Sequence, residues 1–139
     1  VMKQLNESSS STINRINTNS KYFKKKSLFF KWNKEKFFSE IEINQITLND
    51  YIKRHNIPKI DFIKIDTEGF ELNAIKGLKQ NHKIIKFIYF EHHYDDMIEK
   101  NYTFKDINLV LKKFGFKKVF KTKMLFRKSF EYIYKNSFI

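Results

Sequence analysis

The sequence of 139 residues contains no cysteine, one proline and three glycines. Without cysteine the chain can form no disulfide, no zinc site built from thiolates and no cysteine nucleophile. Gly69, Gly77 and Gly115 lie too far apart for a glycine-rich phosphate loop, so these residues hold neither a P-loop nor a complete dinucleotide-binding fold. No apolar run approaches the roughly 18 residues of a membrane span. The first residues lack the apolar stretch of a signal peptide, and we therefore expect a cytoplasmic protein.

Arginine is also scarce, although the chain is strongly basic. There are 28 lysine and arginine residues against 15 acidic ones, a net charge of +13, but only three of the 28 are arginine. Arginine is the residue that favours bidentate contacts with phosphates and bases. Lysine, asparagine, isoleucine and phenylalanine are abundant together, and all four have A/T-rich codons. We therefore interpret the charge mainly as a solvated surface and do not expect a nucleic-acid partner.

The chain divides into two parts of different character. Residues 1–38 combine a Ser/Thr/Asn-rich run with a basic-aromatic run, which predicts a loop-rich basic segment with a short strand near 26–30. Residues 39–139 have regular hydrophobic patterns, and hydrophobic residues make up 41% of the whole chain. That is enough apolar material for one core. We expect no domain boundary after residue 39.

Within the second part, strands alternate with helices. The expected elements are a strand at 41–45, a helix from Thr47 to His55, a strand at 60–65 buried on both faces, a helix at 71–78, a strand at 84–91, a helix at 103–114 ended by Gly115, and strands at 116–122 and 129–135. Such alternation implies crossover connections. The predicted fold class is α/β, with a mainly parallel sheet and an antiparallel pair at its edge.

Charged residues follow two of the predicted strands. The first strand ends in Asp66, Thr67 and Glu68, and the second in Glu91 and His92. Ligands of open α/β sheets bind beyond the carboxyl ends of the strands. If the two strands are neighbours, about 4.8 Å apart, these side chains converge on one cleft. A carboxylate or an imidazole there could accept a proton from a substrate hydroxyl.

Plainer interpretations of the same residues exist. Asp66 or Glu68 could merely cap the helix that follows. His92 and His93 alternate in direction, so at most one of them faces the cleft. Oxygen and imidazole ligands from Asp66, Glu91 and His92 could instead hold a divalent metal, which we consider the weaker alternative and do not predict.

Three stretches carry a resemblance to a known family. They are LNDYI at residues 48–52, IDFIKIDTEGFELNAIKG at residues 60–77 and IYFE at residues 88–91. Together they resemble the C-terminal half of the FkbM-type methyltransferases, which are S-adenosylmethionine-dependent enzymes of the Rossmann-like class. Asn49 stands where the family usually has aspartate, and Thr67 where it usually has valine.

The resemblance implies a function and roles for the residues. The expected activity is methyl transfer from S-adenosylmethionine to a hydroxyl of a sugar, a glycan or a small metabolite. Asp66 is the candidate base, His92 an alternative base, and Glu68 and Glu91 are candidates for binding the acceptor. The glycine-rich cofactor loop of the family is missing, and the chain begins with Val1. We therefore expect the C-terminal half of a methyltransferase domain, inactive alone.

Two further expectations complete the sequence-based picture. The family's first strand is missing, so the strand ending at Asp66 has an open edge, and the chain alone should be insoluble or poorly folded. The alternatives to an enzyme are a non-catalytic relic of a methyltransferase and a basic nucleic-acid-binding module. The latter would depend on residues 21–38 more than on Asp66, and its binding would weaken steeply with salt.

Overall fold

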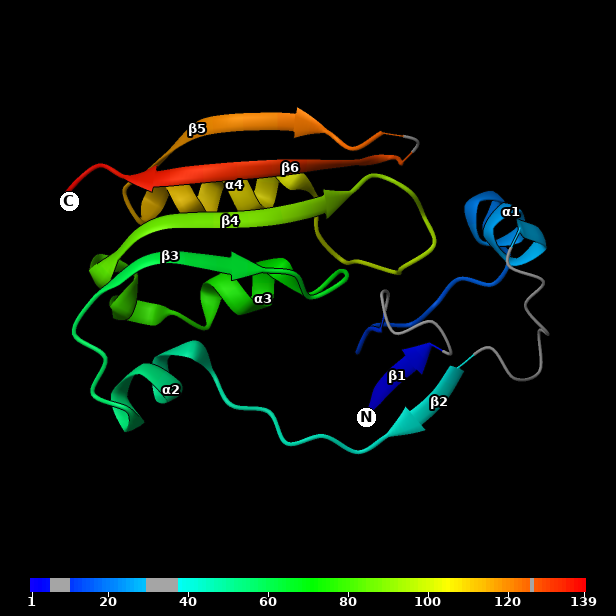
Figure 1. Ribbon diagram of the computed structural model, residues 1–139, viewed down its shortest axis with the longest axis horizontal. Coiled ribbons are helices and arrows are strands. Elements are labelled where there is room, and N and C mark those ends of the chain that lie inside the picture. The colour runs from blue at the N-terminus through cyan, green and yellow to red at the C-terminus, as the bar shows by residue number, and fades with distance from the viewer. Residues whose placement is uncertain (6–10, 30–37, 126) are drawn as a thin grey trace.

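The computed structural model describes residues 1–5, 11–29, 38–125 and 127–139 (Figure 1). Its helices and strands are, in chain order, β1 (Met2–Leu5), α1 (Lys21–Phe29), β2 (Phe38–Ile41), α2 (Leu48–Arg54), β3 (Ile60–Ile65), α3 (Glu71–Lys76), the 3₁₀ helix η2 (Lys79–Ile84), β4 (Ile85–His93), α4 (Phe104–Lys113), β5 (Phe116–Lys123) and β6 (Ser129–Asn136). The described chain is therefore a mixed α/β structure, as the sequence predicts.

The main sheet has four strands in the order β3-β4-β6-β5 (Figure 1). Only β3 and β4 pair in parallel, whereas β4 with β6 and β5 with β6 are antiparallel. The prediction of a mainly parallel sheet is therefore wrong for the described strands, while the antiparallel pair is confirmed. The crossover through α4 makes β5 parallel to β4, but the two strands are not neighbours in the sheet. The final strand β6 then returns and fills the gap.

Local signals place the helix ends correctly. The Thr47 hydroxyl accepts a hydrogen bond from the Asp50 backbone N–H at 3.1 Å and begins α2. At the start of α4, Asp106 Oδ2 accepts from the Thr103 backbone N–H at 2.7 Å, which closes a capping box. Gly115 follows α4 with φ +85°, the left-handed conformation that ends a helix. These contacts involve neighbours in sequence, so the pattern of residues suffices to predict them.

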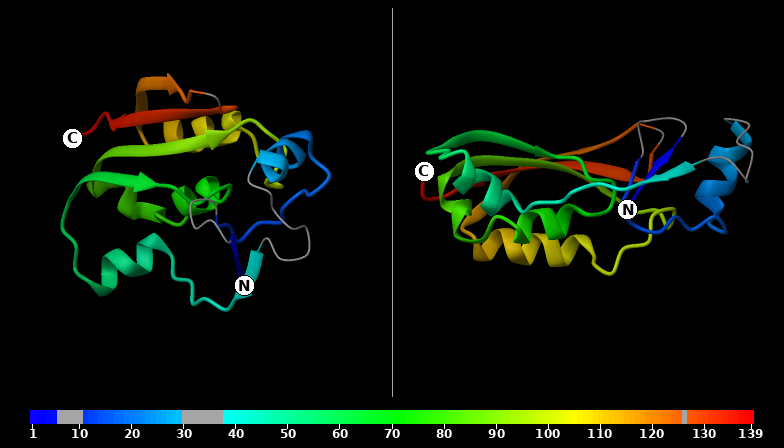
Figure 2. Two further views of the ribbon diagram at one scale, coloured as in Figure 1. Left: turned by 45° about the vertical axis from the view of Figure 1, so that its right-hand side comes forward. Right: turned by 90° about the horizontal axis from the view of Figure 1, so that it is seen from below.

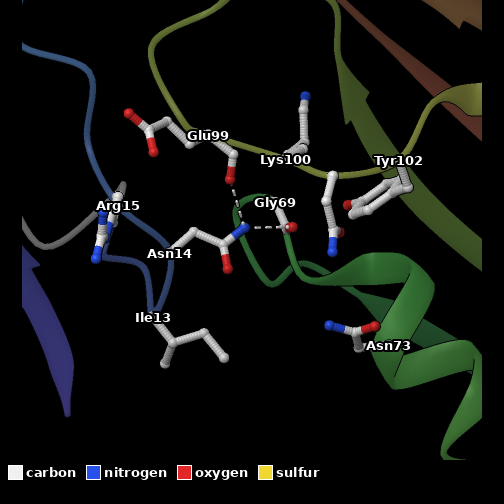
Figure 3. A pocket seen from close by; sticks show the side chains of 9 residues that line it. Ile13, Asn14, Arg15, Gly69, Asn73, Glu99, Lys100 and Tyr102 are labelled. Atoms are coloured by element: carbon white, nitrogen blue, oxygen red, sulfur yellow. Dashed lines mark hydrogen bonds between the residues drawn. The ribbon is translucent and has the colours of Figure 1, made fainter.

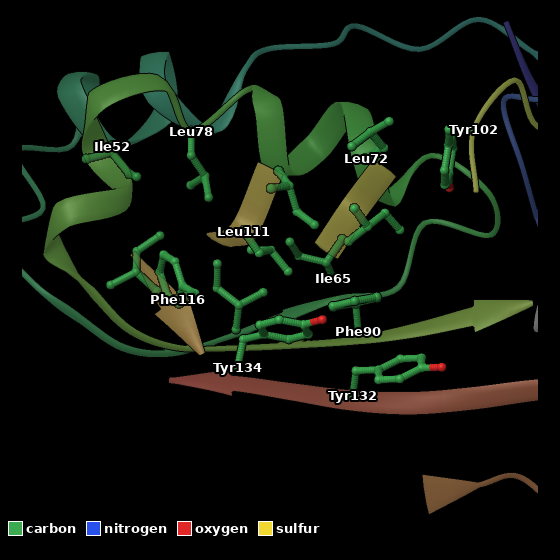
Figure 4. Packing of buried hydrophobic residues seen from close by; sticks show 14 residues of the cluster. Ile52, Ile65, Leu72, Leu78, Phe90, Tyr102, Leu111, Phe116, Tyr132 and Tyr134 are labelled. Carbon is green, nitrogen blue, oxygen red and sulfur yellow. The ribbon is translucent and has the colours of Figure 1, made fainter. Parts of the chain in front are cut away.

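The core lies between one face of the main sheet and the helices α3 and α4, which cover that face (Figure 2, right), and Ile52 of α2 adds to it. Aromatic rings from β4 and β6 point from the sheet toward aliphatic residues of the helices (Figure 4). The buried members of this cluster are Ile52, Ile65, Leu72, Ile75, Leu78, Ile85, Ile88, Phe90, Tyr102, Ile107, Leu111, Phe116, Tyr132 and Tyr134. This single cluster explains how a basic chain of this size holds a folded sheet.

The opposite face of the sheet is largely open, which corrects the prediction for β3. That strand was expected to be buried on both faces, but only Ile65 in it is buried and the Phe62 side chain is 53% exposed. In the described residues β3 pairs along one edge only, with β4, and the helices lie on the other face. An apolar run predicts a strand, but what covers the strand depends on distant parts of the chain.

The N-terminal part forms its own small assembly. β1 and β2 pair antiparallel in a separate two-stranded sheet, and β2 ends at Ile41, earlier than the strand predicted at 41–45. The strand predicted near 26–30 is also wrong, because residues 26–29 belong to α1, while residue 30 lies outside the described residues. The helix places Phe23, which is fully buried, against Met97 of the loop between β4 and α4. That contact attaches α1 to the rest of the molecule.

Candidate functional site

The site is built on the turn that follows β3. Residues 66–69 connect β3 to α3, beside the end of β4, because Ile65 pairs with Phe90 in the parallel ladder. Glu68 has φ +45° and Gly69 has φ +97°. The left-handed region costs a residue with a side chain roughly 1–2 kcal/mol. A strained backbone of this kind persists only where surrounding contacts hold it, and it is common at functional sites.

The Glu71 carboxylate holds this turn from below. Its Oε1 accepts hydrogen bonds from the Gly69 backbone N–H at 2.8 Å and from the Thr67 hydroxyl at 3.2 Å. Its Oε2 accepts from the Tyr102 hydroxyl at 2.5 Å. Glu71 is 2% exposed, and three donors offset the loss of its hydration. The sequence analysis predicts Glu71 only as the first residue of a helix. Its place two residues after Gly69 was a signal that its carboxylate could bind the backbone of the turn.

Beside the turn, three carboxylates surround the imidazole of His93. Its Nε2 lies 3.3 Å from Glu68 Oε2 and 3.3 Å from Glu91 Oε1, and its Nδ1 lies 3.5 Å from Asp95 Oδ2. The His93 side chain is 14% exposed and that of Asp95 only 4%. Glu68 comes from the turn, Glu91 and His93 from β4, and Asp95 from the following loop. The fold therefore brings four ionisable groups to the carboxyl end of β4.

Burial and mutual charge set the protonation of this group. Burial lowers the pKa of His93, but the bond to Asp95 and the charges of Glu68 and Glu91 outweigh it, so the pKa is raised. The pKa of Glu68 is also raised, because the effect of burial exceeds the opposing effect of His93. Burial alone would raise the pKa of Asp95, but His93 and the Met97 backbone N–H hold it below its ordinary value. The surrounding carboxylates therefore stabilise the protonated form of His93.

A cavity of about 40 Å³ opens onto His93. It is lined by Tyr22, Lys26, Glu68, His93, Asp95, Met97, Ile98 and Arg127. Among the residues that the structure describes, the buried oxygens Glu91 Oε1 and Asp95 Oδ2 have no hydrogen-bond partner besides the imidazole that they flank. Two buried carboxylate oxygens with spare acceptor capacity favour a ligand that donates hydrogen bonds, such as a hydroxyl.

His92 lies on the other face of β4, which corrects the expectation that it shares a cleft with Glu68 and Glu91. It is 3% exposed, and its ring packs edge-on against Tyr94, with the ring centres 4.8 Å apart. Burial lowers the pKa of His92 to about 4. Successive residues of a strand point to opposite faces, so the histidine on the face of Glu91 is His93. This two-residue spacing was the signal in the sequence.

Asp66 is set apart from the imidazole site. Its side chain is 43% exposed and lies 2.8 Å from Lys64 Nζ on the same strand. Of the four residues predicted to converge, the structure thus brings Glu68 and Glu91 together, adds His93, and leaves Asp66 at the exposed end of β3. Within the described ranges no group of three or more acidic, histidine or cysteine residues is placed to hold a metal ion. The alternative of a metal on Asp66, Glu91 and His92 therefore gains no support.

Two larger hollows flank the turn. A groove of about 800 Å³ runs along the open side of β3, between residues 63–67, the segment 44–48 and helix α3. A second hollow of about 480 Å³ lies on the other side of the turn, lined by Asn14, Arg15, Gly69 and Lys100 among others (Figure 3). Both are open and reach the backbone of the turn, so the turn is accessible from two sides.

The comparison with family models identifies the family. The model of the methyltransferase FkbM domain matches residues 3–118. The chain therefore belongs to the FkbM methyltransferase family. No curated protein and no solved structure matches it significantly. In the described part of the chain, no helix is long and apolar enough to cross a membrane.

The residues present do not by themselves fit S-adenosylmethionine, the methyl donor that the family implies. A nucleoside cofactor in a Rossmann-like fold needs a glycine-rich turn that opens a helix and an acidic residue for the ribose. The groove beside β3 is large enough, but Gly77, the glycine in its lining, ends α3 rather than beginning a helix. We therefore assign no residue of this chain to the cofactor and derive no step through it.

Proposed function

We propose that this chain forms the acceptor side of an S-adenosylmethionine-dependent methyltransferase that acts on a hydroxyl of a sugar, a glycan or a small metabolite. Membership of the FkbM methyltransferase family supports the reaction class. The observation that carries the assignment of the site is the His93 imidazole, placed between three carboxylates at the carboxyl end of β4. Such a group can take the proton of a hydroxyl and stabilise the resulting imidazolium ion.

In this proposal His93 is the proton acceptor, in place of Asp66 and of the alternative base His92. Glu68 and Glu91 keep the role of binding the acceptor, because both carboxylates lie 3.3 Å from the imidazole and Glu68 also lines the cavity. Asp66 lies outside the imidazole site, where it lines the groove beside β3, and it takes no proton from the acceptor in this proposal. The carboxylates hold the pKa of His93 above its ordinary value, so turnover should rise as the pH increases through that pKa.

The cofactor site then belongs to a further part of the domain. The open edge of β3 and the groove beside it support this, because an unpaired apolar strand edge is normally covered or paired in a native protein. A strand that pairs with β3 would place a cofactor loop next to Asp66. The described residues would thus be the C-terminal half of a Rossmann-like sheet.

The test is methyl transfer by the protein of the complete reading frame, with labelled S-adenosylmethionine and a panel of sugars and polyols. We expect His93→Gln to lower kcat by about 100-fold or more, the usual effect of removing a general base. Asp66→Asn should lower turnover only a few-fold. His55→Gln removes an exposed histidine and serves as the matched control. Wild-type turnover in His93→Gln would remove His93 from the mechanism, and a protein that binds no S-adenosylmethionine would overturn the proposal.

A further inference from the structure

A segment far from the site in sequence holds the backbone of the strained turn. The Thr12 hydroxyl donates a hydrogen bond to the Glu68 carbonyl at 2.7 Å, and Thr12 is 2% exposed. The Asn14 side-chain N–H₂ donates to the Gly69 carbonyl at 2.7 Å and to the Glu99 carbonyl at 3.1 Å (Figure 3). The two carbonyls that these side chains hold belong to Glu68 and Gly69, the residues of this turn that have positive φ.

The segment itself is fixed on both sides. Thr12 and Lys3 exchange two backbone hydrogen bonds, of 2.7 and 3.0 Å, which attach it to β1. The Glu99 backbone N–H donates to the Arg15 carbonyl at 2.9 Å, and the Asn17 N–H donates to the Met97 carbonyl at 2.8 Å. Residues 12–17 therefore lie along the loop that carries Asp95, and they connect this loop to the turn that carries Glu68.

The packing around the turn leaves little freedom. A Cβ atom added at Gly69 would lie 2.6 Å from Ile98 Cγ2 and 3.0 Å from Asn14 Nδ2. Glu68 has a side chain and nevertheless adopts a left-handed backbone, a conformation that surrounding contacts must maintain. If the turn relaxed to a negative φ, the Glu68 carboxylate would leave His93, because the side chain follows its own backbone.

We propose that Thr12 and Asn14 are positioning residues of the site: they hold the Glu68–Gly69 turn in its left-handed conformation and thereby keep the Glu68 carboxylate against His93. Neither residue touches the imidazole, so both act through Glu68. Asn14 also donates to the Glu99 carbonyl in the loop that follows Asp95, so one side chain joins that loop to the turn of Glu68. The expected effect on methyl transfer rests on the proposed function, whereas the position of Glu68 against His93 does not.

The test is the substitution Thr12→Val in the complete protein, read by the NMR titration of His93 with ¹³C-labelled histidine. Valine keeps the shape of threonine and removes the hydroxyl. We expect the pKa of His93 to fall toward its ordinary value, because one of its three carboxylates moves away. The other charged or titratable groups that face the cavity are Tyr22, Lys26 and Arg127, and this variant changes none of them. Thr12→Ser, which keeps the hydroxyl, should restore the titration.

Thr47→Val is the matched control, because it removes a hydroxyl that caps α2 and has no contact with the turn. It should leave the titration of His93 unchanged. If Thr12→Val does not fold, Asn14→Leu takes its place, since Asn14 is only partly buried and its loss frees the Gly69 carbonyl. An unchanged His93 titration in a folded Thr12→Val or Asn14→Leu protein would overturn the proposal.

The kinetic effect separates positioning from simple stability. In the methyl-transfer assay Thr12→Val should lower kcat about ten-fold with little change in KM, and Thr12→Ser should recover it, because a misplaced group slows the step more than it weakens binding. If the wild-type protein transfers no methyl group, the proposed function fails. The titration of His93 still decides whether Thr12 and Asn14 position Glu68.

Discussion

The two faces of β4 differ in burial and in polarity. On the face toward the helices, Ile88, Phe90 and His92 are all buried. On the other face, Tyr89, Glu91 and His93 remain partly accessible and carry the polar groups. Neighbouring histidines consequently have opposite properties, since the pKa of His92 falls to about 4 whereas that of His93 is raised. One face of the strand thus packs into the core, and the other carries the titratable groups of the candidate site.

Truncating one aromatic side chain on each face of the main sheet should give the largest difference in stability. Phe90 is fully buried, so Phe90→Ala should lower the free energy of unfolding by about 3–5 kcal/mol. Phe62 is 53% exposed, and Phe62→Ala should lower it by less than about 1 kcal/mol. Urea denaturation of the 139-residue chain measures both, at a low concentration that limits association through the open edge of β3.

The same two variants should also be measured in a protein that contains any further part of the domain. If a further part of the domain covers the open face, Phe62→Ala should become clearly more destabilising there, by about 2 kcal/mol or more. An equally small effect in both forms would show that this face stays open to water.

The pH dependence of stability should have opposite signs for the two histidines. His92 has a folded pKa of about 4 and an unfolded pKa near 6.5, so the unfolded state binds more protons between these values. Stability should therefore fall as the pH decreases from 6.5 to 4, by about 3 kcal/mol. His92→Phe keeps the aromatic surroundings and should flatten this slope, as denaturant midpoints at several pH values would show.

For His93 the folded pKa is raised, so its contribution is complete below the unfolded pKa near 6.5 and is lost as the pH rises through the folded value. His93→Gln should remove that alkaline decline and leave the acid slope intact. If both variants altered the same side of the profile, the assignment of the two histidines to different environments would be wrong.

Removing single hydroxyl groups should have the smallest effects. Tyr134 is fully buried and donates to Asn108 Oδ1 at 2.8 Å, so Tyr134→Phe should destabilise the chain by about 1 kcal/mol. Tyr89 donates to Glu131 on the open face, where water can replace the partner, and Tyr89→Phe should cost less than about 0.5 kcal/mol. Thermal unfolding of both variants is sufficient, and a larger loss for Tyr89→Phe would reverse the ranking of the faces.

Interactions between sequence neighbours are the part of the fold that could be predicted. Thr47, Thr103 and Gly115 act within one helical turn, and the structure places the corresponding helix ends within one or two residues. The insertion of β6 between β4 and β5 could not be predicted in this way, because it depends on which edge a returning strand meets. The exposure of Phe62 likewise depends on what the rest of the chain leaves uncovered.

The site was predictable in part for the same reason. Strand ends in a parallel pair lie side by side, which was enough to bring Glu68 and Glu91 together. Residues two apart on a strand share a face, so the histidine on the face of Glu91 is His93, and the prediction of His92 was wrong. Thr12 and Asn14 give no comparable signal, since their contacts with the turn join residues 55 or more positions apart.

Those long separations have a consequence for synthesis. The hydrogen bond from Asn14 to Glu99 spans 85 residues, which a ribosome adds in roughly 4–17 s. Asn14 is made 55 residues before Gly69 and 85 residues before Glu99, so neither partner exists when Asn14 is added to the chain. Residues 11–29 must therefore wait without their final partners, with Phe23 exposed. Among the described residues, this segment is therefore among the last to reach its final contacts.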